Sequence, residues 1–233
     1  MKFRIRSAAS LSTLFLLALS FLAAVAFAGP PLICYAFDIG GAKSLPWISE
    51  SWNLSGAETY NTRNLASDTI AILDSNSTVL VHMETLRRAT LFARKDPQAA
   101  KELLTRLVAR YESPATSGHP SALAAFDAGY LAEAYKQWLG KDGSNPANHF
   151  DGYDLVKKAI QLRGDDPQME FAAALIAVEG SASDRLEHAQ RALAGSKNDP
   201  LLARNLASHF GGPDTITLAE FISQNSATKV ARQ

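Results

Sequence analysis

Between residues 166 and 213, apolar positions recur at helical spacing and are interrupted by signals for helix starts and ends. Asp166 precedes Pro167, so a side-chain acceptor for the free N–H groups of a first helical turn comes before a residue already fixed at a helical φ. The apolar residues that follow are three or four positions apart, at Met169, Ala172, Ala173 and Ile176. The pattern predicts a short helix that Gly180 ends.

Two more helices are predicted directly downstream. Ser181 and Asp184 have the spacing of a capping box, which is typical of the first turn of a helix. The dipeptide Asp199-Pro200 starts the next helix, and Gly211-Gly212-Pro213 closes it with residues suited to a left-handed cap and a stop. The stretch therefore predicts antiparallel helices with both ends marked.

The helix starts recur at a spacing typical of helix-pair repeats. Asp-Pro dipeptides begin at residues 96, 166 and 199, so they lie 70 and 33 residues apart, about two periods and one period of a 35-residue unit. Here the chain resembles the tetratricopeptide repeat (TPR) family: Gly180, Ala189 and Pro200 correspond to its small-residue turn, second-helix alanine and terminal proline. The resemblance covers about 164–212 directly and implies a solenoid of stacked helix pairs.

The remaining sequence also has helical periodicity and no useful alternation of the strand type. Helices are predicted near 66–73, from the cap Ser77 to Arg94, from Pro97 to Tyr111, and over 121–139 and 153–163. We therefore expect an all-α fold, with antiparallel helix pairs stacked as a short TPR-like right-handed solenoid. The expected organisation is a signal peptide (1–28), an extended arm (29–61), a helical-repeat domain (62–224) and a flexible tail (225–233).

The first 28 residues have the pattern of a secretory signal peptide. Lys2, Arg4 and Arg6 precede an uncharged run over 7–28 that ends in small residues around a phenylalanine. We expect a mature chain that starts at Gly29 and is exported to the periplasm or the extracellular space. The alternative is an uncleaved membrane anchor, since the run has 22 residues.

Charge and cysteine content restrict the function further. The whole chain has 23 basic and 23 acidic residues, and removing the segment 1–28 leaves 20 against 23, a net charge of −3. A nucleic-acid partner is disfavoured by this balance. Cys34 is the only cysteine, so an internal disulfide is excluded and packing must supply the stability.

The arm is rich in aromatic residues, unlike a solvated linker. Tyr35, Phe37, Trp47 and Trp52 need a surface to cover, which favours an ordered arm. The strings Gly-Pro-Pro-Leu-Ile-Cys (29–34) and Lys-Ser-Leu-Pro-Trp (43–47) resemble the N-terminal signature of an uncharacterised family of secreted bacterial helical proteins. That resemblance implies export and a helical fold and supplies no activity.

Motifs for a catalytic or cofactor site are absent from the sequence. The histidines are not spaced as zinc ligands, and no Gly-x-Ser-x-Gly sequence occurs. Residues 40–44 lack the glycines of a phosphate loop and are interpreted as a plain turn. We predict no metal and no cofactor. Cys34 is expected to be a small buried apolar residue, with a reactive or intermolecular thiol as the alternative.

Two groups of residues are candidates for a site. Asp127 lies beside the apolar stripe of its helix, so its carboxylate needs a partner, and Glu84, Arg87 and Arg88 could supply one. We expect these four residues to form one buried polar link that ties two helices together. General acid–base catalysis is the alternative.

The second group is aromatic and lies on the helix predicted over 121–139. Tyr130 and Tyr135, with Phe126 and Trp138, suit either core packing or the lining of a solenoid groove that binds an extended peptide. Core packing is favoured because most of these residues follow the apolar period.

The leading functional hypothesis is an exported, non-enzymatic helical-repeat protein that acts as a protein-interaction module and binds another protein or peptide. One alternative is an enzyme that uses Glu84, Asp127 and Tyr130, or the Cys34 thiol. Another is a structural component of the cell envelope.

Overall fold

The computed structural model describes residues 29–47, 58–113, 121–140 and 143–210. The predicted signal peptide, Trp52, the predicted stop at Gly211–Pro213 and the predicted tail at 225–233 lie outside these ranges. Within them the chain forms eight α-helices and no β-strand, so the all-α class is confirmed. The helices are α2 (Leu65–Asp74), α3 (Val79–Ala93), α4 (Pro97–Glu112), α5 (Ala122–Trp138), α6 (Gly152–Arg163), α7 (Pro167–Ile176), α8 (Ala182–Gly195) and α9 (Pro200–Phe210).

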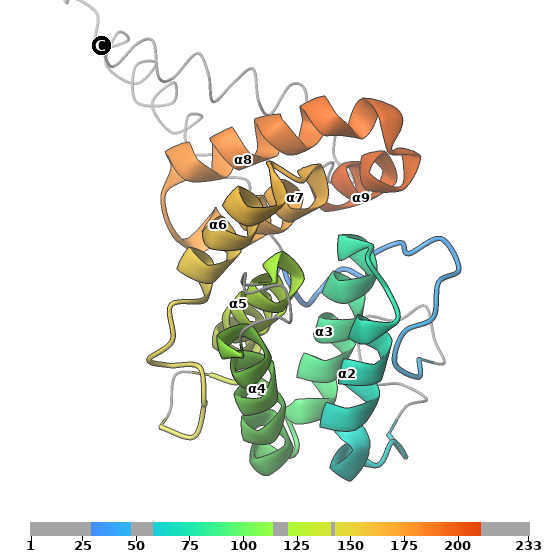
Figure 1. Cartoon of the computed structure of the whole chain (residues 1–233), viewed down its shortest axis with the longest axis vertical. Helices are drawn as coiled ribbons and strands as arrows, with labels where there is room; N and C mark the ends of the chain where they lie inside the picture. The colour runs from blue at the N-terminus through green and yellow to red at the C-terminus, as the bar shows by residue number, and fades with distance from the viewer. Residues whose placement is uncertain (1–28, 48–57, 114–120, 141–142, 211–233) are drawn as a thin grey trace, which may run out of the picture.

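The helices form two groups that meet along α5 and α6. Helices α2 to α5 lie side by side, and α7 to α9 cross one end of them (Figure 1). The most extensive helix contacts are those of α5 with α6 and of α7 with α8. The core continues from one group into the other through α5 and α7.

The predicted Asp-Pro and capping-box starts all form. Asp96 accepts from the amide of Ala99, and Asp166 accepts from the second and third residues of α7. Ser181 accepts from Asp184 N–H, and Asp199 accepts from the amide of Leu202. These helix starts follow from local chemistry alone, because the acceptor and the free N–H groups are three residues apart or fewer.

Two expectations about helix positions differ from the structure. The N-cap of α3 is Thr78 rather than Ser77, and its side chain makes no capping hydrogen bond. The midpoint of the 70-residue interval between the Asp-Pro starts falls near residue 131, which lies inside the unbroken helix α5. The interval from residue 96 to residue 166 therefore does not consist of two equal helix-pair units.

Helices α5 and α6 cross at a pair of glycines. A Cβ built on Gly129 would lie 2.5 Å from the carbonyl oxygen of Gly152 and 2.9 Å from Leu155 Cβ. The backbones approach so closely that only hydrogen fits at this crossing. This contact fixes the position of the second helix group on the first.

Gly129→Ala is expected to lower the free energy of unfolding by about 2 kcal/mol, because overpacking outweighs the better helix propensity of alanine. The matched control is Gly143→Ala, whose added Cβ would meet nothing within 4 Å. Urea denaturation of both variants checks the prediction. Equal midpoints for Gly129→Ala and the parent protein would contradict the close approach.

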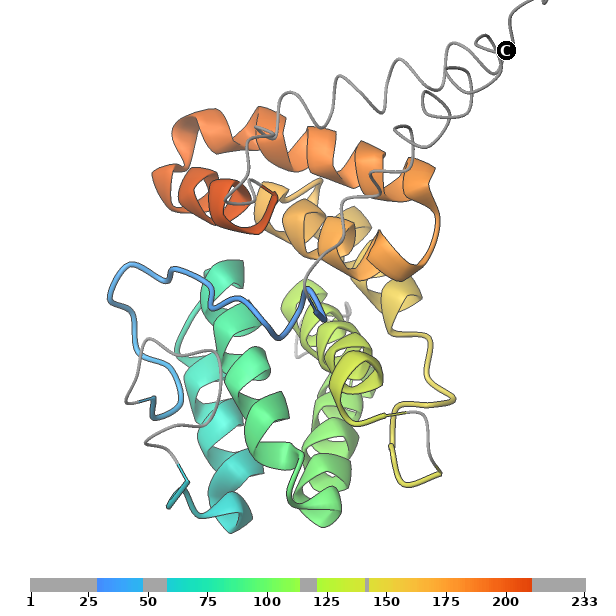
Figure 2. The ribbon, with the colours of Figure 1, turned by 180° about the vertical axis from the view of Figure 1, so that it is seen from behind.

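The first described part of the predicted arm, residues 29–47, is called the arm from here on, and it is ordered by packing rather than by regular secondary structure. Leu32, Ile33 and Leu45 are fully buried, and Phe37 is almost fully buried. The arm starts against α5, crosses between the two helix groups past α3 and α9, and continues along the first group (Figure 2). An arm with no periodic structure thus completes the core of the helical domain.

Candidate functional site

Helix α3 carries a buried ion cluster at the centre of the molecule. Every residue of α3 except Arg88 is buried, so the helix is surrounded by other parts of the protein on all sides. Arg87 and Arg88 each lie one turn after Glu84, at i+3 and i+4. Arg87 Nε donates to Glu84 Oε2 at 2.7 Å, and Arg88 Nε donates to Glu84 Oε1 at 2.6 Å. Glu84 and Arg87 are both 0% exposed.

The cluster contains one more positive than negative charge. Burial raises the pKa of Glu84, but the hydrogen bonds and charges of Arg87 and Arg88 outweigh it, and the net pKa is lowered. The carboxyl group is therefore ionised, and two guanidinium groups surround one carboxylate. A buried excess of positive charge requires further acceptors.

The main chain of the arm supplies these acceptors. Arg87 Nη1 donates to the carbonyl oxygen of Ile33 at 3.1 Å, and Arg88 Nη1 donates to the carbonyl oxygen of Leu45 at 2.6 Å. In return, the amide of Phe37 donates to Glu84 Oε2 at 3.0 Å. The ion cluster thus binds the arm through backbone atoms at three points.

Helices α5 and α9 hold further backbone groups of the arm. Gln137 of α5 accepts from the amide of Leu32 at 3.0 Å. Asn205 of α9 accepts from the amide of Asp38 through Oδ1 and donates to its carbonyl oxygen through Nδ2, both at 2.9 Å. One side chain therefore satisfies both backbone groups of a single residue. Arg204 of α9 donates through Nε to Asp38 Oδ2 at 2.7 Å. We call the residues that bind the arm the arm site: Glu84, Arg87, Arg88, Gln137, Arg204 and Asn205.

Aromatic contacts accompany these polar contacts. The guanidinium carbons of Arg87 and Arg88 lie 5.1 and 5.7 Å from the ring centroid of Trp47. The ring of Phe37 stacks on His209 and meets Phe171 edge to face. The arm is therefore held by both backbone and ring contacts, the two kinds of contact by which folded domains bind extended peptides.

Comparisons with protein-family models, curated proteins and solved structures find no match for this chain.

None of the helices described has the length and apolar character needed to span a bilayer. Within the same ranges, His, Cys, Asp and Glu side chains do not gather in a group of three or more that could hold a metal ion.

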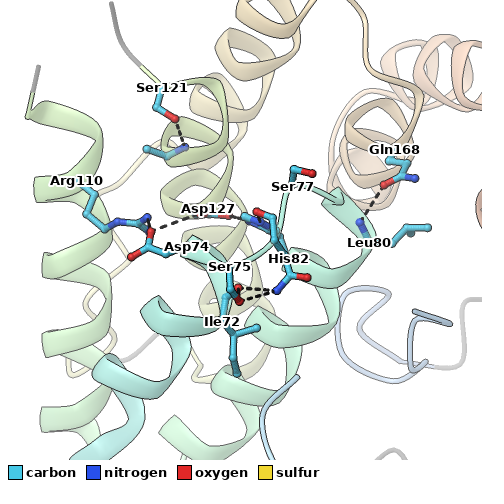
Figure 3. Close-up of polar contacts among 12 residues, drawn as sticks. Ile72, Asp74, Ser75, Ser77, Leu80, His82, Arg110, Ser121, Asp127 and Gln168 are labelled. Carbon is cyan, nitrogen blue, oxygen red and sulfur yellow. Dashed lines mark hydrogen bonds and ion pairs between the residues drawn. The ribbon is translucent and has the colours of Figure 1, made fainter. Parts of the chain in front are cut away.

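Asp127 belongs to a different cluster from Glu84, so the predicted single link is wrong in its pairing. Asp127 Oδ1 lies 2.6 Å from His82 Nδ1, and Asp127 Oδ2 lies 3.8 Å from Arg110 Nη1. Arg110 also pairs with the exposed Asp74 (Figure 3). The buried carboxylate does tie helices together, but its partners come from α3 and α4 rather than from the Glu84 turn.

His82 faces acceptors with both ring nitrogens. Its Nδ1 faces the Asp127 carboxylate, and its Nε2 lies 3.2 Å from the carbonyl oxygen of Asn76. Burial lowers the pKa of His82, but the hydrogen bond and charge of Asp127 outweigh it, and the net pKa is raised. A protonated ring can donate to both acceptors, which is the arrangement that the raised pKa favours.

Tyr130 and Tyr135 are core residues. Both are 0% exposed, and their hydroxyl groups have no hydrogen-bond partner among the described residues. Burial raises the pKa of both phenols, and the Glu84 charge adds to the rise at Tyr130. Neither side chain can touch a partner in this conformation.

Cys34 is only partly buried, which corrects the expectation of a fully buried thiol. It lies on the arm between Ile33 and Tyr35. Burial raises the pKa of the thiol, with an opposing effect from the Arg87 charge. The raised pKa keeps the thiol protonated and unreactive at neutral pH.

A second buried carboxylate joins α7 to α8. Glu170, which is 0% exposed, accepts from His188 Nδ1 and from Arg191. His188 Nε2 lies 2.9 Å from the hydroxyl of Tyr153. Burial and nearby carboxylates raise the pKa of Tyr153 to about 12, so the phenol is protonated and is not a nucleophile. This chain of contacts connects three helices.

A surface pocket of about 520 Å³ lies between α4 and residues 143–150, away from the arm site. Leu104, Val108 and Phe150 supply its apolar lining, and Lys101 and Glu112 are its charged residues. None of the predicted site residues lines it.

The α9 half of the arm site was not predicted from the sequence. Asn205 and Arg204 lie 167 and 166 positions from Asp38, so no local pattern connects them. The one available signal was the polar side chain of Asn205, which directly precedes Leu206 of the apolar stripe and would need a hydrogen-bond partner if buried. Glu84, Arg87 and Arg88 were predicted as a site, but their ligand is the arm.

His209 makes the fold sensitive to acid. Burial lowers its pKa from 6.5 to about 4, opposed by backbone hydrogen bonds and the Glu84 charge. Because the pKa of His209 is lower in the folded than in the unfolded chain, protonation of His209 favours the unfolded chain. The free energy of unfolding is therefore unaffected by His209 above pH 6.5 and decreases as the pH falls toward 4. The expected loss is about 3 kcal/mol.

His209→Phe should remove most of this acid dependence, because a phenyl ring has similar size, stacks on Phe37 and cannot be protonated. The exposed His149 supplies the control variant, His149→Phe, which should keep the parent's acid dependence. Urea denaturation from pH 4 to pH 7 measures both. A parallel decline of parent and His209→Phe would contradict the assignment.

Proposed function

We propose that the protein is an exported protein-interaction module whose helical domain binds an extended polypeptide segment at the arm site, where its own arm is bound in cis. The single observation that supports this function is the set of backbone contacts made by Glu84, Arg87, Arg88 and Asn205. Side chains that bind backbone N–H and C=O groups supply affinity for an extended chain, and the surroundings of its buried side chains supply specificity.

Three features of the arm support its exchange for another peptide. Its described residues form no helix or strand, and its backbone is held by side chains rather than by a ladder of backbone bonds. The arm-site groups are charged or polar, so water can solvate them when the arm leaves. The arm also precedes all the helices of the described ranges, so none of them includes it.

The repeat architecture is part of the same proposal. We propose that α5–α6 and α7–α8 are helix pairs stacked as a short solenoid, resembling the TPR family. The capped starts of α7 and α9 and the extensive packing within both pairs support it. Stacked pairs leave a face that the core does not consume, and such a face suits peptide binding.

Export rests on the sequence of residues 1–28 alone. A mature chain that begins at Gly29 would place the arm at its N-terminus, where it is free to leave its site. N-terminal sequencing of exported material is expected to give Gly29 as the first residue. An intact Met1 would contradict export by cleavage.

The enzyme alternative has weaker support. Glu84 and Tyr130 are 0% exposed and Asp127 is 1% exposed, so none of the three faces a substrate. Both nitrogens of His82, the ring beside Asp127, already contact acceptors.

Cleavage of the connection between arm and domain tests the proposed function. A protease site is introduced within residues 48–57 of the full chain, and the chain is folded before it is cut. A fluorescent peptide of residues 29–47 should then exchange into the cut protein, with a rise in anisotropy and a Kd in the micromolar range. The uncut protein should bind the peptide at least ~100-fold more weakly, because its own arm competes at high effective concentration.

A peptide of the same composition in scrambled order is the control and should not bind. Circular dichroism of the cut protein verifies that the helices persist. Unfolding when the arm is displaced, or failure of the labelled peptide to bind, would show that the arm is a permanent structural element.

A further inference from the structure

We infer that the arm site selects peptides in which an aromatic residue is followed directly by an acidic residue, as in Phe37-Asp38. This inference rests on the proposed function and specifies the partner: a polypeptide segment with an aromatic–acidic pair. The residues that read the pair come mainly from α9, which supplies Arg204, Asn205 and His209.

The aromatic position is bound on two sides. The rings of Phe37 and His209 stack with centroids 4.6 Å apart and planes at 8°, and Phe171 meets Phe37 edge to face at 6.0 Å and 81°. Phe37 is 3% exposed. A flat ring fills the space between these two rings, whereas an aliphatic side chain of similar volume loses the stacking on His209.

The acidic position lies at the edge of the same site. Arg204 Nε donates to Asp38 Oδ2 at 2.7 Å, and the amide of Gly40 donates to Asp38 Oδ1 at 2.9 Å. The Arg204 side chain is 58% exposed, so this contact adds little affinity, and its main effect is to disfavour a cation at that position. The lowered pKa of Asp38, caused first by the Arg204 hydrogen bond and then by Gly40, agrees with this pairing.

Asn205 fixes the register between the two positions. Its side chain binds both the amide and the carbonyl oxygen of Asp38, and Glu84 binds the amide of the preceding Phe37. A peptide shifted by one residue could keep these backbone contacts, but its aromatic and acidic side chains would no longer both lie against His209 and Arg204. The order of the pair is therefore specified: aromatic first, acidic second.

The other buried arm residues have less selective surroundings. Leu32, Ile33 and Leu45 are buried in the general apolar core. Apolar residues of similar size repack at such positions with small effects. The Phe37-Asp38 pair therefore carries more of the specificity than these three residues.

The test uses the cut full chain and labelled peptides of residues 29–47. The Phe37→Ala peptide should bind about 100-fold more weakly or worse, and the Asp38→Lys peptide about 10-fold more weakly. A peptide with the two residues exchanged should bind as weakly as the Phe37→Ala peptide. The control is Ala36→Ser, which changes an exposed arm residue and should bind like the parent.

A charge reversal in the protein separates selectivity from general weakening. Arg204 is exposed, so Arg204→Glu should fold, and it should bind the Asp38→Lys peptide more tightly than the parent peptide. Equal binding of all peptides to both proteins would overturn the selectivity and leave the proposed function intact. Absence of binding by the parent peptide would overturn both.

Discussion

Replacing Glu84 with alanine is expected to lower the free energy of unfolding by about 3–5 kcal/mol, in the range measured when one partner of a buried ion pair is removed. The change leaves Arg87 and Arg88 without their carboxylate and the amide of Phe37 without its acceptor. Arg87 is 0% exposed, so water cannot replace the lost partner while the arm is bound. Urea denaturation measures the effect.

The chain contains a matched control for Glu84. Glu102 and Arg106 form an i, i+4 pair at 2.8 Å with both side chains well exposed. Glu102→Ala should therefore change the free energy of unfolding by less than about 0.5 kcal/mol. Similar small effects for Glu84→Ala and Glu102→Ala would mean that the α3 cluster is solvated and does not hold the arm.

Asp127→Ala is expected to cost about 3 kcal/mol, because it leaves the buried His82 ring and the Arg110 guanidinium without their shared carboxylate. Asp127→Asn should cost less, since an amide oxygen still accepts from His82 Nδ1. Unchanged denaturation midpoints for both variants would contradict the pairing.

The His82–Asp127 pair also predicts a dependence on alkaline pH. The folded pKa of His82 is raised above 6.5, so its stabilisation is complete below 6.5 and is lost as the pH rises through the folded value. Asp127→Asn should abolish this decline, because the charge that raises the pKa is gone. The pH dependence of urea midpoints, from pH 6 to pH 9, measures it.

Local chemistry made most of the helices predictable. Asp96, Asp166 and Ser181 begin helices as expected, since a cap and its N–H groups are neighbours in sequence. The all-α class follows from the same signals. The burial of Tyr130 and Tyr135 also agrees with their position on an apolar period.

Long-range pairing was not predictable from one sequence. Asp127 has His82 as its partner, although an i, i+4 argument on α3 suggested the turn of Glu84. His82 and Glu84 are two residues apart on α3, so they project from nearly opposite faces of the helix. Because both faces of α3 are buried, its periodicity does not show which face packs against α5. The contacts of the arm with α9 depend on how the two helix groups pack, which no local pattern encodes.

Hydrogen exchange of the native, uncut protein tests the central claim most directly, because it compares the opening of the arm with global unfolding. The relevant amides are those of Leu32, Phe37 and Asp38, which are bonded to Gln137, Glu84 and Asn205. If the arm is exchangeable, these amides exchange through a local opening whose free energy is several kcal/mol below the opening free energy of α5 amides such as that of Leu131. The opening free energy of the arm amides should also change little when low concentrations of denaturant are added. Exchange of arm and α5 amides at the same free energy would contradict the account.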